Sequence, residues 1–298
     1  MADNGIEPIR VLADGTIKQV NPLSGTQVWT VPGRGNRPIG GASSSDEPID
    51  TERNGRHCAF CSGRYLDTPP EKSRLVRAGE GWRTLTGLPA SELGASTAEF
   101  RRVPNLFEIL SLDYWEDNHG YRMPESARER MRAYLAEPEG YEHVMGVARG
   151  KALASGVTEA AWEELDEEAR LDWADNFFAG GHDLIVARRH FVDGAVTQDQ
   201  LAGSGTLSPE EHRVYVGFTI AAMRDLYELS PEVRYVSTFQ NWLRPAGASF
   251  DHLHKQLVAI DEIGVQAERE YSKVQARPNI YNEMAVDYAA SRGLVLAE

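Results

Sequence analysis

The residues from Phe239 to Gln256 include several side chains that could do chemistry close together in the chain. The run reads Phe-Gln-Asn-Trp-Leu-Arg-Pro-Ala-Gly-Ala-Ser-Phe-Asp-His-Leu-His-Lys-Gln. Side chains of an extended segment alternate in direction, so His252, His254 and Gln256 are expected on one face. The small residues from 246 to 249 would let a phosphate approach the backbone. The run predicts an anion-binding site beside a nucleophile. A bare H-x-H in a strand is equally typical of two partly exposed histidines that are hydrogen-bonded to neighbouring groups.

A second group is the pair Cys58 and Cys61, the only two cysteines of the chain. Thiols separated by two residues form a redox pair or half of a metal site more often than a structural disulfide. Gly63 allows a tight turn after the second thiol, as metal sites of this spacing need. No thioredoxin-like β-α-β pattern surrounds the pair, which favours the metal site.

Composition sets limits on the class of protein. The chain has 298 residues, 41% of them hydrophobic, and a formal net charge of −14. It can therefore bury one large core or two modest ones, as a soluble globular protein. No apolar run approaches the roughly 18 residues that span a bilayer, and the N-terminus lacks a basic region followed by an apolar one, so a cytoplasmic location is expected. The negative charge argues against a nucleic-acid polymer or a membrane as partner.

The elements that must position these residues are read from periodicity and turn signals. Strands are expected at 15–20 and 26–31, between 74 and 110, at 180–190 and 233–239, and through 257–260 after the histidines. Ser208 begins a capping box with proline at the first helical position, and an apolar stripe behind it predicts a helix of about five turns. A further helix is expected from 266. The pattern predicts an α+β protein with helices packed on an antiparallel sheet.

The composition between 111 and 177 is helical. One helix is expected at 124–137, with proline at its start and Pro138 at its stop. A second is expected at 158–177 with Thr158 as its cap. This segment is interpreted as an inserted helical subdomain, whose uses include an acceptor pocket or a partner contact.

Three motifs resemble one known family. They are N-x₅-G-A-S-x₂-H-x-H-x-Q at 241–256, C-x-x-C-x-G at 58–63, and N-P-L-S-G followed by V-W-T-V-P-x-R-x-x-R-P at the start. All three are similar to the galactose-1-phosphate uridylyltransferase-like branch of the histidine-triad (HIT) superfamily. The resemblance implies a HIT-like catalytic domain formed by 1–110 and 178–275, interrupted by the helical insertion 111–177. Residues 276–298 would be a C-terminal extension, where a second repeat of the family would begin. Arg64 departs from the family, which usually has asparagine there.

The resemblance also implies roles for single residues. His254 would attack the α-phosphorus of a UDP-sugar and become uridylylated, while Gln256 holds the phosphoryl oxygens. A zinc ion would be held by Cys58, Cys61, His190 and His252, with His182 a weaker candidate that reads as a surface residue at a strand entry. Arginines in a surface loop are usually solvated, but the family places them on substrate phosphates. The implied substrate-binding residues are Arg34, Arg37, Asn105, Asn241, Gly247 and Ser249.

The sequence therefore predicts a nucleotidyltransferase of carbohydrate metabolism, moving UMP between sugar phosphates. Its partners would be a nucleotide sugar and a sugar phosphate, and a homodimer is allowed. A nucleotide phosphorylase would use the same nucleophile with inorganic phosphate as acceptor, and a hydrolase would use water. An inactive zinc-stabilised binding module is the alternative from another class. Against it, His254 and Gln256 are both present, and a binding module needs no nucleophile.

Overall fold

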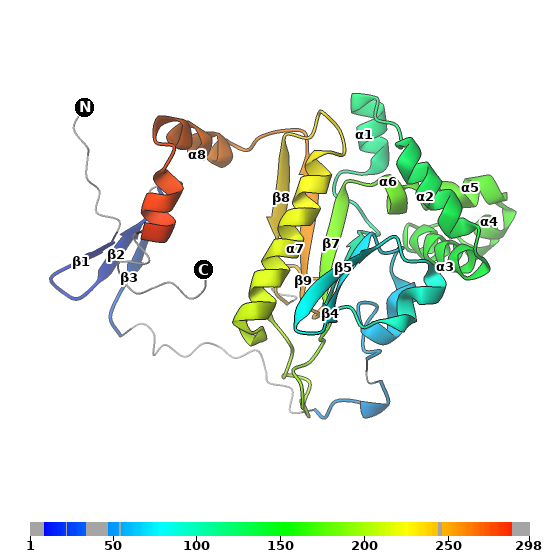
Figure 1. The fold of residues 1–298 in the computed structure, drawn as a ribbon, viewed down its shortest axis with the longest axis horizontal. Helices are drawn as coiled ribbons and strands as arrows, with labels where there is room; N and C mark the ends of the chain where they lie inside the picture. The colour runs from blue at the N-terminus through cyan, green and yellow to red at the C-terminus, as the bar shows by residue number, and fades with distance from the viewer. Residues whose placement is uncertain (1–8, 22, 34–46, 54, 244–245, 288–298) are drawn as a thin grey trace. The chain divides into compact units, whose positions relative to one another are not determined.

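The computed structural model describes residues 9–21, 23–33, 47–53, 55–243 and 246–287 (Figure 1). The chain forms two compact units, one of Met1–Ser44 with Ile263–Glu298 and the other of Ser45–Glu262. The second unit contains the larger of the two sheets and most of the helices. Within the described residues, no helix combines the length and the apolar composition needed to cross a bilayer.

The first unit contains a small antiparallel sheet in the order β1-β2-β3. The side-chain oxygen of Asn21 accepts from the backbone N–H groups of Leu23 and Ser24, which builds the turn before β3. Lys273 donates to the carbonyl of Leu23 at 2.7 Å and so joins a helix to this turn. The strands expected at 15–20 and 26–31 and the helix expected from 266 are confirmed as β2, β3 and α8, whereas β1 and a π-helix were not predicted. Their bounds are β1 Ile9–Val11, β2 Ile17–Val20, β3 Gln27–Thr30, α8 Val265–Ala276 and a π-helix at Asn282–Asp287.

The second unit is built on a six-stranded sheet in the order β5-β4-β6-β7-β9-β8, in which every pair is antiparallel. The predicted α+β class with an antiparallel sheet and packed helices is thus confirmed. The neighbouring strands β7 and β9 are far apart in the sequence, and their pairing brings the 180–190 segment beside the histidine segment. The strands are β4 Ser73–Ala78, β5 Gly81–Thr86, β6 Phe100–Pro104, β7 His182–Ala187, β8 Tyr235–Phe239 and β9 His254–Ile260.

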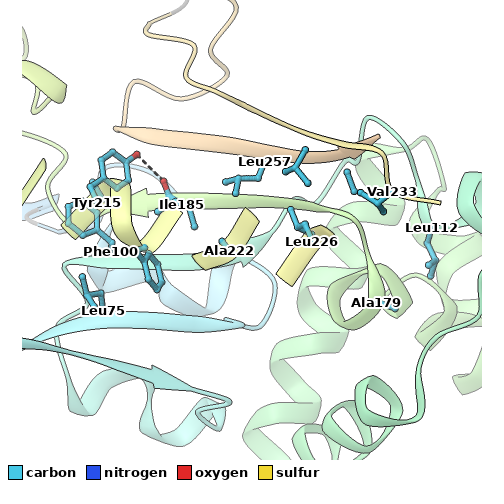
Figure 2. Close-up of a cluster of buried hydrophobic side chains, with 14 of the residues drawn as sticks. Leu75, Phe100, Leu112, Ala179, Ile185, Tyr215, Ala222, Leu226, Val233 and Leu257 are labelled. Carbon is cyan, nitrogen blue, oxygen red and sulfur yellow. Dashed lines mark hydrogen bonds between the residues drawn. The ribbon is translucent and has the colours of Figure 1, made fainter. Parts of the chain in front are cut away.

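One face of this sheet is covered by α7, Pro209–Tyr227 (Figures 1 and 2). The predicted capping box is present, because the Ser208 hydroxyl accepts from the Glu211 N–H and the Glu211 carboxylate accepts from the Ser208 N–H. Tyr215 stacks on Phe100 with ring centroids 4.5 Å apart and donates to the carbonyl of Ile185. This face is an apolar core whose members include Leu75, Phe100, Ile185, Tyr215, Ala222, Leu226 and Leu257.

Between β6 and β7 the chain forms six helices, which Figure 1 shows grouped at one end of the unit. Most of them share a separate hydrophobic core around Val144, Trp162 and Phe177, whereas Leu112 and Trp115 of the first helix belong to the core under α7. Buried His143 joins them to the rest of the unit, because its ring contacts the Tyr134 hydroxyl and the carbonyl of Thr68, each at 2.7 Å. The bounds are α1 Leu112–His119, α2 Glu125–Leu135, α3 Pro138–Ala154, α4 Glu159–Glu164, α5 Glu167–Asp172 and α6 Asp175–Ala179.

Two sequence predictions in this segment need correction. The helix expected over 158–177 is three short helices. Thr158 does cap the first of them, but Leu165 is extended and Asp166 caps α5 through the Ala169 N–H. An aspartate that bonds a nearby backbone N–H competes with a continuous helix. Pro138 stops the preceding helix but also begins α3, which the sequence analysis missed because proline is favoured at the first helical position as well as after a helix.

Short 3₁₀ helices lie at Thr51–Arg53, Ser62–Asp67, Ala90–Ala95 and Ser204–Thr206.

Candidate active site and metal centre

The site lies on the face of the six-stranded sheet opposite α7. Alternation along β9 sends His254 and Gln256 to this face and Leu257 to the α7 core. The register pairs Val186 with His254 and Leu184 with Gln256. These β7 residues pack with Phe60 and Val103 in a small apolar cluster that supports the site from below.

Cys58, Cys61, His190 and His252 meet in one cluster, with one ligand atom of each lying within 4.8 Å of all the others. The two sulfurs are 3.8 Å apart. The Nδ1 atom of His190 is 3.4 and 3.5 Å from them, and that of His252 is 3.5 and 3.8 Å away. Both imidazoles thus present the same ring nitrogen to the thiols, and the four residues can hold a metal ion.

The surroundings of the cluster hold its ligands in place. His252 donates from Nε2 to the carbonyl of Ala187 at 2.6 Å, so its Nδ1 faces the thiols with a free electron pair. Cys61 donates its backbone N–H to the Cys58 carbonyl, and the hydrogen bond from the Cys58 side chain lowers the pKa of the Cys61 thiol. At Gly63 a side chain would lie 2.8 Å from the Gly55 carbonyl oxygen, so the turn after the second thiol requires glycine because of close approach.

His254 is buried, and its ring is oriented by its own backbone. Nδ1 donates to the carbonyl of His252 at 2.7 Å, and the ring packs against Phe60 with centroids 5.2 Å apart. Nε2 makes no hydrogen bond within the described part of the chain. Burial lowers the pKa of His254, which keeps the ring neutral at physiological pH. The arrangement leaves one nucleophilic electron pair on Nε2.

Gln256 lies two residues further along the same face. Its side-chain oxygen is 3.1 Å from Nε2 of His182, and Asn105 Nδ2 is 3.0 Å from the same ring atom. The reading of His182 as a surface residue is therefore wrong, because only 1% of it is exposed. The signal that could have found it is period two, since His182, Leu184 and Val186 fall on one face of β7.

The loop between β8 and β9 contains three of the predicted substrate ligands. Asn241 and Gly247 are close, because a side chain on Gly247 would lie 3.7 Å from Asn241 Nδ2. Gly247 has φ of +87°, as a tight turn requires, and Ser249 is exposed just before the histidines. Phe107, two residues after the predicted ligand Asn105, is 51% exposed. Arg34 and Arg37 lie outside the described residues.

Two thiols and two imidazoles that could hold a metal ion thus lie beside an oriented histidine, on the face of the antiparallel sheet opposite α7. The chain belongs to the family described as "Domain of unknown function (DUF4921)", whose model matches residues 12–298. No curated protein matches the chain in sequence.

Two solved structures are similar to it. One is an ADP-glucose phosphorylase from Arabidopsis thaliana with bound ADP-glucose, 13% identical with a TM-score of 0.39 over 90% of this chain and 55% of that one. The other is a GalT-like protein from Arabidopsis thaliana, 15% identical with a TM-score of 0.35 over 78% of this chain and 48% of that one. The chain spans about half the length of each.

Proposed function

We propose that this protein is a nucleotidyltransferase of the hexose-1-phosphate uridylyltransferase type, which transfers UMP between sugar phosphates through a nucleotidyl group on His254. The observation that carries the proposal is the state of the His254 ring. It is buried, its Nδ1–H donates to a backbone carbonyl, and Nε2 is left as the nucleophile beside Gln256. The resemblance of the 241–256 segment to the uridylyltransferase branch supplies the substrate class.

In the first step the Nε2 electron pair of His254 forms a bond to the α-phosphorus of the nucleotide sugar. The bond between that phosphorus and the bridging oxygen breaks, and its electron pair leaves with the sugar phosphate. The ring keeps its Nδ1 proton and becomes positively charged, and the His252 carbonyl stabilises this charge. In the second step a phosphate oxygen of another sugar phosphate attacks the same phosphorus and restores the neutral imidazole.

Gln256 would donate its amide N–H to a non-bridging phosphoryl oxygen as charge builds there. Asn105, Asn241, Gly247 and Ser249 would position the substrate, and the two arginines of the N-terminal loop would bind its phosphates. An acidic protein needs such local donors, because its overall field repels phosphate.

The metal ion is proposed to be zinc. A tetrahedral ion with bonds of about 2.3 Å to sulfur and about 2.0 Å to nitrogen would place two sulfurs about 3.8 Å apart and each sulfur about 3.5 Å from a ring nitrogen. The observed separations of 3.4 to 3.8 Å fit these values. With all four positions taken by protein, the ion would be structural and would fix the strand that contains the nucleophile.

The test is to mix the protein with UDP-sugars or with ADP-glucose in the absence of an acceptor. The expected product is one nucleotide per chain, acid-labile, and located at His254 by peptide mass spectrometry. His254→Ala should form none, and His212→Ala, which changes an exposed histidine on α7, should match the wild type. Absence of an adduct with every donor would contradict the proposal and favour a binding module.

The acceptor is then identified from the isolated adduct. Under the proposal, sugar 1-phosphates discharge it and regenerate a nucleotide sugar with ping-pong kinetics. Discharge by inorganic phosphate alone would make the protein a phosphorylase, and discharge by water alone would make it a hydrolase.

A further inference from the structure

We infer that His182 is a positioning residue, which holds the Gln256 carboxamide with its oxygen toward the ring and its NH₂ group toward the active face. This inference rests on the proposed function, in which that NH₂ group donates to the transferred phosphoryl group. His182 lies at the start of β7, on a different strand from the nucleophile.

The hydrogen bonds of the ring determine where its proton lies. The backbone N–H of Ile109 donates to Nδ1 of His182 at 3.1 Å, so Nδ1 carries an electron pair. A neutral imidazole has one protonated nitrogen, and in this ring it must be Nε2. Burial lowers the pKa of His182 to about 4, which keeps the ring neutral at physiological pH. The Nε2 proton faces the Gln256 side-chain oxygen at 3.1 Å.

Asn105 does not offer this proton a second acceptor. Its side-chain oxygen accepts from the Phe107 N–H at 3.1 Å, so the atom 3.0 Å from His182 Nε2 is the amide nitrogen, a donor. Within the described residues, Gln256 Oε1 is the acceptor that the structure provides for the Nε2 proton.

The consequence concerns the orientation of Gln256. A carboxamide can turn over and exchange its oxygen with its nitrogen at almost the same positions. Turned over, Gln256 would place its NH₂ group against the Nε2–H of a ring that is 1% exposed, leaving a buried donor without an acceptor. His182 therefore selects the orientation in which both N–H groups of Gln256 are free for a phosphoryl oxygen.

Two variants of His182 separate orientation from folding. In His182→Asn the side-chain oxygen can replace Nδ1 as acceptor for the Ile109 N–H, but no donor reaches Gln256. In His182→Gln an amide nitrogen lies near the former Nε2 position. Single-turnover formation of the nucleotidyl adduct should slow about tenfold in His182→Asn, less than the roughly 100-fold loss expected when such a donor is removed. The affinity of His182→Asn for the nucleotide sugar should stay within about threefold of the wild-type value. His182→Gln should recover most of the wild-type rate of adduct formation.

The same substitution in a Gln256→Ala background shows whether His182 acts through Gln256. There, His182→Asn should slow the step less than about twofold, because the group that it orients is gone. A tenfold loss in both backgrounds, or wild-type rates in His182→Asn, would overturn the inference.

A measurement without substrate keeps this result separate from the proposed function. In protein labelled with ¹⁵N-histidine, long-range ¹H–¹⁵N spectra should show His182 as the Nε2–H tautomer, with its Nε2–H signal shifted in Gln256→Ala. An Nδ1–H tautomer, or a signal unchanged in Gln256→Ala, would refute the orientation whether or not the protein is active. If the wild type forms no adduct while the tautomer and shift are as expected, the proposed function fails and the orienting contact stands.

Discussion

The two faces of the six-stranded sheet are formed by the same strands and have opposite character. On β9, Leu257 and Ala259 enter the core under α7, while His254 and Gln256 face the other way. On β7, Ile185 enters the same core and His182 faces the site. Even the charges of the α7 face are paired, since Asp183 lies 2.7 Å from Arg102 and 2.8 Å from Lys72.

The site face is organised differently. Its polar groups are fixed mainly by backbone carbonyls and by each other, and His254 Nε2 and the Gln256 amide nitrogen make no hydrogen bond within the described part of the chain. Donors and acceptors left open beside an apolar support are what a transferred phosphoryl group needs. The comparison indicates that one face supplies stability and the other chemistry, and substitutions on each face can test that division.

The largest effect is expected at the nucleophile. His254→Ala should reduce adduct formation by at least about 1,000-fold, because no other imidazole is in its place. The midpoint of thermal unfolding should change by no more than a few degrees, since the α7 core is untouched. Adduct quantification by intact mass and a thermal melt of the same sample measure both. If His254→Ala lowered the unfolding midpoint by much more than a few degrees, the site face would also be needed to maintain the fold.

The converse change is Leu257→Ala, on the α7 face directly after the site residue Gln256. Leu257 is fully buried, so its truncation should lower the free energy of unfolding by about 2–5 kcal/mol. The fraction that remains folded should form adduct at a rate close to wild type. Urea denaturation and single-turnover kinetics at low temperature test the two parts. A rate loss comparable to that of His254→Ala would break the division between the faces.

Removal of the metal ion should affect stability before chemistry. Chelation of metal-loaded protein is expected to lower the free energy of unfolding by about 3–4 kcal/mol, the linkage for an ion present at about 100 to 1,000 times its dissociation constant. Cys58→Ala should bind less metal and resemble the chelated protein. Elemental analysis and denaturation of both samples provide the test. If protein prepared with zinc contains none, or if Cys58→Ala retains a full complement, the cluster has another role.

A smaller effect concerns pH. Burial lowers the pKa of His182 to about 4 and also lowers that of His254. Below the ordinary imidazole pKa of about 6.5 the unfolded chain therefore binds more protons than the folded protein, so stability is complete above that pH and declines between about pH 6.5 and 4. His182 accounts for at most about 3 kcal/mol of this decline. Denaturation from pH 7.5 to 4.5 should show a shallower decline in His182→Asn than in wild type or His212→Ala, and parallel curves would contradict it.

Much of this arrangement could be predicted because it depends on local spacing. The capping box at Ser208 fixes the start of α7 through bonds that span three residues. The spacing of His252, His254 and Gln256 gives their alternation on or next to one strand, and Cys58-x-x-Cys61 with its glycine defines a turn. Periodicity could not place the break at Leu165, because a single aspartate cap outweighed a continuous apolar pattern.

What only the tertiary structure decided is which distant residues meet. The family resemblance predicted that His190 joins the two thiols as a metal ligand. In the structure, the pairing of β7 with β9 brings the segment that contains His190 beside the segment that contains His252. Period two places His182 on the same face of β7 as Leu184 and Val186, but its burial and its partners depend on segments far away in the sequence. Its partners are Ile109, in the loop between β6 and α1, and Gln256, 74 residues away on β9. Short-range spacing sets which way a side chain points, whereas its burial and its hydrogen-bond partners depend on strand register between distant segments, which only the folded sheet specifies.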